Sequence, residues 1–434
     1  MLLKRIQLGF IHVALTMTLV PMNSALNRVM INELALSATL VAVLASLPFL
    51  FSPIQVAIGA FSDRNPIFGW RRTPYIFIGL LFCAAGLFFS PRIAYLLAEN
   101  FSAGLIIGIL SFGAWGVGYN FASVSYFSLA TEISGEKGRS RTIAVMFFMM
   151  VVSIILTSLA LSNMLEPFSR AALESSFTLI GAIALALGLI GLIKLEERNR
   201  APETKEERHD WREMYRGLRD TPQVMLFFRY LILMLVAILG QDVLLEPFGA
   251  VAFNLSVSET TRITSIWGTF FLLSLSLGGV LENRVSKFRQ AKIGGWTGAA
   301  AFLLIVLSGS LQSTALFYSG VVILGLATGL ATVSNLSLML DMTTKDRVGL
   351  FVGIWGMANA LARLVGNVLS GVVRDSVTSL TGNGLAGYQT VFIIELLLLL
   401  SSLWLLKSIS VSRFQSQTGD QFNLTERAAL AGES

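Results

Sequence analysis

The sequence reads Gly59-Ala-Phe-Ser62-Asp63-Arg64-Asn-Pro-Ile-Phe-Gly69-Trp-Arg71-Arg72 between two long apolar runs, at about 37–62 and 74–97. A helix needs about 20 apolar residues to cross the hydrocarbon core of a bilayer, and both runs meet that length. A short link rich in arginine between two such runs is typical of a loop that joins membrane-spanning helices. This segment therefore predicts an all-α integral membrane protein.

The same alternation of apolar runs and short polar links continues along the whole chain. Twelve spans are predicted, at about 6–31, 37–62, 74–97, 102–130, 142–163, 175–194, 224–248, 262–281, 293–311, 314–340, 350–373 and 388–407. The segment that begins LEERNRAPETKEERHDWREMYRGLRDTP at Leu195 is dense in charge and predicts a linker with an interfacial helix at Trp211–Leu218. The predicted parts are a six-helix half (1–194), a cytoplasmic linker (195–223), a second six-helix half (224–407) and a cytoplasmic tail (408–434).

The composition excludes an ordinary soluble protein. Hydrophobic residues make up 54% of the 434 residues and charged residues 13%, whereas soluble domains carry about 25% charged residues. Single soluble cores stop growing at about 250–300 residues, so lipid must cover the remaining apolar surface. Cys83 is the only cysteine, which excludes a disulfide framework and a cysteine-based metal site.

The basic residues predict the orientation of the chain. The N-terminus, the links on its side, the central linker and the tail hold 25 of the 32 lysines and arginines. Cytoplasmic loops are enriched in these residues, so both termini are expected in the cytoplasm. The same bias accounts for the net charge of +6, and no nucleic-acid partner is predicted.

Three short segments of the first half recur in order in the second half. They are Leu34–Thr39 with Leu255–Thr260, Gly59–Asp63 with Gly278–Glu282, and Ser128–Glu132 with Ser337–Asp341. Each pair follows an equivalent span. Parallel repeats of this kind predict two pseudo-symmetric halves.

The opening segment resembles the loop motif of the major facilitators, G-x-x-x-D-R/K-x-G-R/K-R/K, with extra residues before the second glycine. The resemblance implies the major facilitator fold and a role in conformational gating. The motif residues are Gly59, Ser62, Asp63, Arg64, Gly69, Arg71 and Arg72. The alternative is a basic loop that only holds the topology.

Longer runs resemble the PucC-type bacteriochlorophyll-delivery family, a branch of the major facilitators that includes the LhaA-type assembly proteins. They are Ala25–Leu34, Gly69–Tyr75, Gln241–Gly249 and, more weakly, Trp355–Asp375. The resemblance implies a bacterial inner or thylakoid membrane and chlorophyll or bacteriochlorophyll as a bound ligand. It also implies light-harvesting or photosystem subunits as partners. Whether pigment is moved, held or escorted stays open.

Charged residues inside the spans suggest a latch between the halves. Asp242 and Glu246 are four residues apart and share one helix face, at the depth where Arg28 ends the first span. Charges are costly in hydrocarbon, so we expect Arg28 to pair with Asp242 or Glu246 on the periplasmic side. The alternatives are that each side chain reaches the interface alone, or that the carboxylates carry protons.

Five polar residues are candidate pigment or cavity contacts: His12, Asn27, Asn120, Gln241 and Arg363. A histidine imidazole binds the metal of a pigment well, although a lone histidine on an apolar helix is more often structural. Arg363 is expected to face a cavity or another helix. No nucleotide-binding loop, redox-cofactor site or catalytic constellation is found, so no enzyme activity is predicted.

Two rival functions fit the same sequence. An exporter of another lipophilic small molecule would alternate its access between the two sides of the membrane. A non-transporting scaffold would use its outer helix faces to escort antenna subunits, with membrane lipid as its other neighbour.

Overall fold

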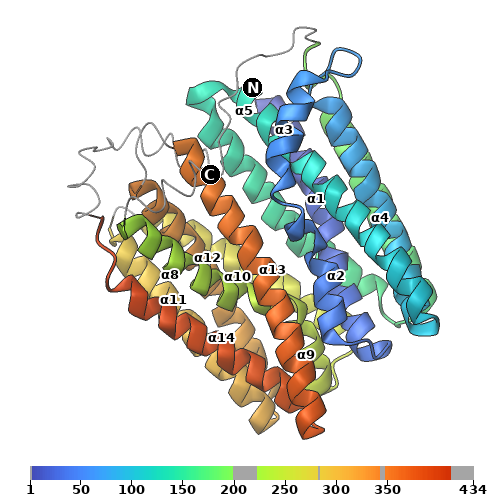
Figure 1. The fold of residues 1–434 in the computed structure, drawn as a ribbon, viewed down its shortest axis with the longest axis vertical. Coiled ribbons are helices and arrows are strands. Elements are labelled where there is room, and N and C mark those ends of the chain that lie inside the picture. The colour runs from blue at the N-terminus through green and yellow to red at the C-terminus, as the bar shows by residue number, and fades with distance from the viewer. Residues whose placement is uncertain (1, 199–221, 282–283, 343–347, 412–434) are drawn as a thin grey trace.

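The computed structural model describes residues 2–198, 222–281, 284–342 and 348–411, and these residues are almost entirely helical. Eleven helices in this part of the chain are long and apolar enough to cross a membrane. They form two side-by-side bundles, one from the first part of the chain and one from the second (Figure 1). The predicted interfacial helix at Trp211–Leu218 and most of the predicted linker and tail lie outside the described residues.

The first bundle consists of α1 (Leu2–Pro21), the π-helical turns η1 (Met22–Leu26) and η2 (Val29–Glu33), α2 (Ala38–Leu50), α3 (Ile54–Arg64), α4 (Thr73–Glu99), α5 (Phe101–Met164) and α6 (Arg170–Leu192). The second consists of α8 (Pro222–Leu239), the 3-10 turn η3 (Gly240–Val243), α9 (Leu245–Phe253), α10 (Val257–Leu281), α11 (Lys287–Leu311), α12 (Thr314–Asp341), α13 (Val348–Thr381) and α14 (Gly384–Leu406).

These helices account for the twelve predicted spans. The described part of α5 contains two of them, Phe101–Gly135 and Arg141–Met164, which meet where Gly135 leaves the helical conformation at φ 60° and ψ 171°. The second predicted span is divided between α2 and α3, and neither helix is long enough to cross a membrane alone. Eleven of the twelve predicted spans are therefore confirmed as long apolar helices, and the sequence did not predict the division of the second.

Prolines explain the break in the second span. Pro48 lies inside α2, and Pro53 precedes α3, so two backbone N–H donors are missing within six residues. The chain leaves the α-helix at Phe51 and resumes it at Ile54. The Asn120 side-chain amide donates to the Pro48 carbonyl at 2.9 Å, which satisfies a backbone acceptor beside the break.

The seventh span is interrupted as well. It runs through α8, tightens into η3 and continues as α9. Pro247 lacks the N–H that would bond one turn back, which favours the tighter turn before it. At this point the helix approaches α13 closely, since a methyl group on Gly366 would lie 2.9 Å from the Gly240 Cα.

The two bundles meet along α2 against α13 and α5 against α10. We call the end of the molecule where α1 begins and α14 ends the terminal end, toward the top of Figure 1, and the opposite end the distal end. Among the described residues, the hydrogen bonds between the bundles lie in the distal part: Ser24–Glu246, Arg28–Leu255, Asn32–Pro247, Ala38–Asp375, Thr39–Asp375, Ser46–Asn367, Ser158–Thr261, Ser162–Ser258 and Glu166–Ser258. The described chain is thus sealed across the distal end of the seam.

Close packing of the helices depends on glycine at several crossings. Gly79 on α4 faces α5, and a methyl group there would lie 2.5 Å from the Gly118 carbonyl oxygen and 2.7 Å from the Ala122 amide nitrogen. Both atoms belong to backbone, which cannot rotate away. The α4–α5 crossing therefore requires the absence of a side chain at this position.

We expect Gly79→Ala to lower the free energy of unfolding by about 1–3 kcal/mol, because the methyl group forces the two helices apart. The measurement is unfolding of the purified protein in detergent. Gly279→Ala is the matched control, since a methyl group there meets nothing within 4 Å. Equal stability of the two variants would contradict this account of the crossing.

Candidate functional site

A buried carboxylate joins the two bundles at the distal part of the seam. Glu246 on α9 is 5% exposed, and its Oε1 accepts hydrogen bonds from the hydroxyls of Ser24 at 2.6 Å and Thr264 at 2.7 Å. Ser24 lies in η1, a π-helical turn that follows Pro21. Irregular turns of this kind occur often at functional sites, because they re-aim side chains. Here the turn directs a hydroxyl of the first bundle at an acid of the second.

The ion pair predicted for Arg28 is wrong. The Arg28 guanidinium instead pairs with Glu33, five residues along its own helix, and donates to the Leu255 carbonyl across the seam at 3.2 Å. The second π-helical turn, Val29–Glu33, brings Glu33 within reach.

Asp242 pairs with Arg363, one of the predicted cavity contacts. The Arg363 Nη1 lies 2.5 Å from the Asp242 Oδ2, and the side chains are 34% and 25% exposed. Phe49 of the other bundle lies beneath the guanidinium, 5.6 Å from ring centre to Cζ. This pair is therefore a charged, partly accessible group at the seam, where it can receive a polar part of a ligand.

A second carboxylate closes the seam between α2 and α13. Asp375 accepts hydrogen bonds from the backbone N–H groups of Ala38 at 3.2 Å and Thr39 at 2.8 Å, and from the Thr39 hydroxyl at 2.7 Å. Arg374 donates to the same carboxylate at 2.8 Å. An acid at a helix N-terminus satisfies free donors and opposes the positive end of the helix dipole. In this case the acid comes from the opposite bundle.

The predicted gating motif forms a network inside the first bundle. The Arg72 guanidinium donates to the Ser62 hydroxyl at 2.7 Å and to Glu132 near the end of a span of α5 at 3.0 Å. Arg71 lies 3.9 Å from Glu132. Glu196, which follows α6, accepts the backbone N–H groups of Arg71, Arg72 and Thr73 and so caps α4.

The remaining motif residues occupy the loop and the end of α3. Gly69 adopts φ 84° in the turn that the Ile67–Trp70 bridge closes, a conformation that favours glycine. Gly59 is half-buried and accepts a hydrogen bond from Ser62 through its carbonyl, while Arg64 is exposed. The Asp63 side chain lies outside the described part of the structure. A gating role for the motif stays a prediction.

The second bundle repeats the ion pair of the first. Lys287 at the start of α11 lies 2.9 Å from Asp341 at the end of α12, just as Arg72 before α4 meets Glu132. Glu132 and Asp341 end the third pair of repeated segments. The internal repeat thus corresponds to equivalent contacts between equivalent helices.

His12 is enclosed by aromatic rings. Its ring centre lies 5.1 Å from that of Tyr126, 5.7 Å from Phe127 and 5.3 Å from Phe147, and the residue is 6% exposed. Its Nδ1 is buried without a hydrogen-bond partner. The imidazole has the chemistry of a pigment ligand, but in this conformation the three rings occupy the space around it.

The three predicted amide contacts form hydrogen bonds within their own bundles. Asn27 donates to the Asn23 carbonyl at 3.0 Å, and Gln241 donates to its neighbour Asp242 at 3.0 Å. The Asn120 amide group donates to two backbone carbonyls, and its oxygen accepts from Gln55 at 2.5 Å. A structural role therefore accounts for Asn120.

Sequence reasoning missed four acids that the structure places at key contacts: Glu132, Glu196, Asp375 and Glu395. Glu395 carried a usable signal, because it is an acid within the apolar run of the last span. The other three lie at or near span ends, where acids are common.

Over most of its length, the chain is similar to PucC proteins and to a protein named for bacteriochlorophyll synthesis. A family model described as PUCC protein matches residues 25–414. Protein PucC of Cereibacter sphaeroides is 30% identical over 413 residues, which cover 90% of this chain and 88% of that protein. A protein named bacteriochlorophyll synthase 44.5 kDa chain, of Rhodobacter capsulatus, is 25% identical and is matched over 86% of this chain and 87% of its own.

Solved structures share the fold at low sequence identity. The nucleoside transporter NupG superposes with a TM-score of 0.75 at 15% identity, covering 94% of this chain and 99% of its own. An inward-facing bacterial homologue of the lysosomal transporter Spinster gives a TM-score of 0.70 at 14% identity, covering 97% and 98%. These likenesses confirm the predicted major facilitator fold.

We expect Asp242→Asn and Arg363→Gln each to lower the free energy of unfolding by about 1–3 kcal/mol, because each leaves a charged partner unpaired. The double variant should recover part of this loss, since neither charge remains. Unfolding of all three variants in detergent gives the coupling energy. As a control, Glu99→Gln removes one side of an exposed pair with Arg170 and should cost less than about 1 kcal/mol. Strictly additive losses would contradict the pairing.

We expect Asp375→Ala to open the distal end of the seam. The lost hydrogen bonds are worth about 1 kcal/mol each, so the equilibrium between the closed and the open seam should shift toward the open form by about tenfold or more. The readout is the rate at which an impermeant maleimide labels Ser46→Cys from the distal side, in a Cys83→Ala background. Ser46 is fully buried against Asn367. Glu99→Ala, which removes a carboxylate away from the seam, is the control. Equal labelling of both variants would show that Asp375 does not hold the distal end closed.

Proposed function

Because this chain belongs to the PucC protein family, we propose that it binds a chlorophyll-type tetrapyrrole and assists the assembly of light-harvesting or photosystem pigment–protein complexes. The observation that carries the proposal is the near-full-length match to PucC proteins and to a relative named for bacteriochlorophyll synthesis. The proposal assigns the chain no enzymatic turnover, nucleotide or redox cofactor.

The chemistry of the seam supports a large, mostly apolar ligand. The intramembrane charges described here are paired or hydrogen-bonded, and the Asp242–Arg363 pair remains partly accessible beside the Phe49 ring. Ligand sites commonly combine apolar and aromatic walls with a few polar groups that fix orientation. A tetrapyrrole, with a flat ring and polar edge groups, suits such a surface.

His12 is the side chain best suited to bind the central metal of a pigment. Its Nδ1 has no protein partner, and neutral imidazole is a good metal ligand. Binding a macrocycle there requires that at least one of the surrounding rings of Tyr126, Phe127 and Phe147 moves aside. His12 therefore belongs to the proposal as a ligand for a more open conformation.

The proposed setting is the inner or thylakoid membrane of a photosynthetic bacterium. We place the terminal end in the cytoplasm, because most of the lysines and arginines fall in the links and tails on that side. The distal seal then faces the periplasm or the lumen. Pigment would reach the seam from the cytoplasmic side or from the lipid, and the receiving subunits would meet the chain within the membrane.

Transport of a lipophilic molecule is a second candidate, favoured by a specific observation. The hydrogen bonds between the bundles gather at one end, as alternating access requires of a one-sided conformation. The structural neighbours reported above are a nucleoside transporter and a bacterial homologue of a lysosomal transporter. A transporter would move its ligand across the membrane, whereas an assembly factor needs only to hold and release it.

The test is the absorption spectrum of the protein purified gently from a pigmented photosynthetic host. We expect Soret and Qy bands at a ratio near one pigment per chain, and a reduced pigment content in Arg363→Gln and His12→Phe. Glu99→Gln is the control and should keep the pigment, since its carboxylate lies away from the seam. Colourless, monodisperse wild-type protein would overturn pigment binding, and ligand movement in liposomes would then favour the transporter.

A further inference from the structure

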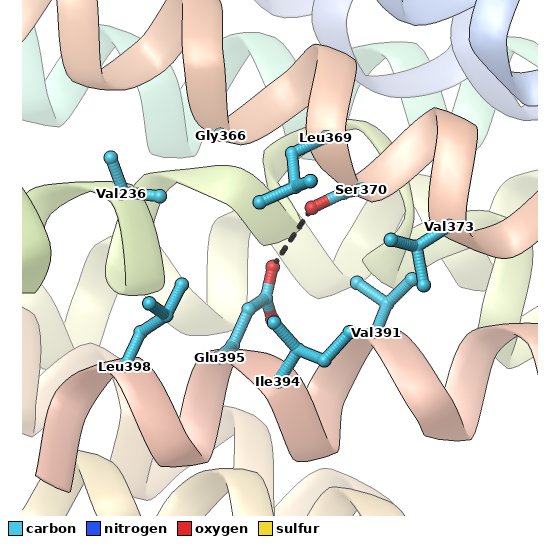
Figure 2. Close-up of a pocket in the computed structure, with 9 residues that line it drawn as sticks. All are labelled: Val236, Gly366, Leu369, Ser370, Val373, Val391, Ile394, Glu395 and Leu398. Carbon is cyan, nitrogen blue, oxygen red and sulfur yellow. Dashed lines mark hydrogen bonds between the residues drawn. The ribbon is translucent and has the colours of Figure 1, made fainter. Parts of the chain in front are cut away.

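Glu395 is an acid buried deep in the second bundle, and neither the gating motif nor the seam contacts use it. It lies in the middle of α14 and is 2% exposed. Figure 2 shows its carboxyl group directed toward α13, between apolar side chains of α8, α13 and α14. The lining includes Val236, Leu369 and Leu398. An acid in such surroundings within a membrane span calls for a functional explanation.

The hydrogen bonds of Glu395 are weak for an ionised carboxylate. Its Oε1 lies 3.3 Å from the Ser370 hydroxyl, and its Oε2 is buried without a partner. Hydroxyl donors to an ionised carboxylate usually lie about 2.5–2.7 Å away. Glu246 shows that shorter pattern, with hydroxyls at 2.6 Å and 2.7 Å. The Oε2 of Glu246 is also buried without a partner, so the two glutamates differ in the hydrogen bonds that Oε1 accepts.

The charges near Glu395 do not neutralise it. The turn η3, which packs against α14, carries a second acid, Asp242, whose charge would repel an ionised Glu395. The two arginines of α13 nearest to this point, Arg363 and Arg374, are paired with Asp242 and Asp375. The residues of α8 and α14 that line the cavity beside Glu395 are apolar. Removing an ion from water without a counter-ion costs several kcal/mol in real proteins, so the neutral acid is strongly favoured.

A cavity of about 10 Å³ adjoins the carboxyl group (Figure 2). A space of about 10–15 Å³ holds one water molecule when polar partners are present. The unpartnered Oε2 of Glu395 and the Ser370 hydroxyl line this space. A water molecule there would accept a hydrogen bond from the O–H of the neutral acid and connect the acid to Ser370.

We propose that Glu395 is a proton-binding site, held as the neutral carboxylic acid in this conformation and bridged to Ser370 through one water. Its state is tied to η3, because a methyl group on Gly240 would lie 3.0 Å from the Glu395 Oε1. Any movement of η3 against α13 and α14 therefore changes the space around the Glu395 carboxyl group and the electrostatic potential at that group. The ligand of this site is a proton, so the inference does not depend on the pigment.

The test is infrared spectroscopy of the purified protein in lipid nanodiscs at neutral pH. A protonated carboxyl group gives a carbonyl stretch that shifts in D₂O and that an ionised carboxylate lacks. We expect this band in the wild type, its loss in Glu395→Gln and its retention in Glu246→Gln. An unchanged band in Glu395→Gln, or no band in the wild type, overturns the proposal.

A second variant keeps the acid and removes its hydroxyl partner. Ser370→Ala should shift the carbonyl band without abolishing it, because the hydrogen bonding of the neutral acid changes. This result is expected even if Glu395→Gln proves too unstable to purify. A band that does not respond to Ser370→Ala would assign the proton to another carboxyl group and reject Glu395 as the site.

Discussion

A charge inside hydrocarbon must find its partner within the protein, and this constraint organises the described seam. Arg28 binds Glu33 and a carbonyl, Arg363 binds Asp242, and Asp375 binds the start of α2. Each contact replaces hydration that lipid cannot supply. The irregular turns near these residues follow from the same need, because they aim side chains that a straight helix would direct elsewhere.

The constraint also separates two kinds of buried acid. Glu246 accepts two short hydrogen bonds from hydroxyls, one in each bundle, so it links the bundles. Glu395 accepts one long hydrogen bond and lies beside a small cavity. The first acid therefore contributes to the seal between the bundles, whereas the second is suited to hold a proton.

The spans could be predicted from the sequence because their length and composition are set by the thickness of the bilayer. The internal repeat could also be predicted from the sequence, and its acids Glu132 and Asp341 make equivalent ion pairs. The partner of Arg28 could not be predicted, because the sequence gives the depth of a side chain in the membrane but not its direction around the helix axis. The π-helical turns changed that direction and favoured Glu33 over the acids across the seam.

The breaks within spans could not be predicted from the sequence for a related reason. Prolines occur inside intact helices of this chain as well, such as Pro91 in α4. Whether a proline divides a span depends on what satisfies the freed backbone groups. For the second span that group is the Asn120 amide, which lies 72 residues away in the sequence.

The divided second span has a mechanical consequence. Its α2 segment is fastened to the second bundle by Asp375 and by the contact between Ser46 and Asn367, while its α3 segment ends in the motif network of the first bundle. A continuous rod would pass every tilt of one end to the other. Because the helix is interrupted at residues 51–53, each segment can keep its own contacts while the bundles rotate relative to each other.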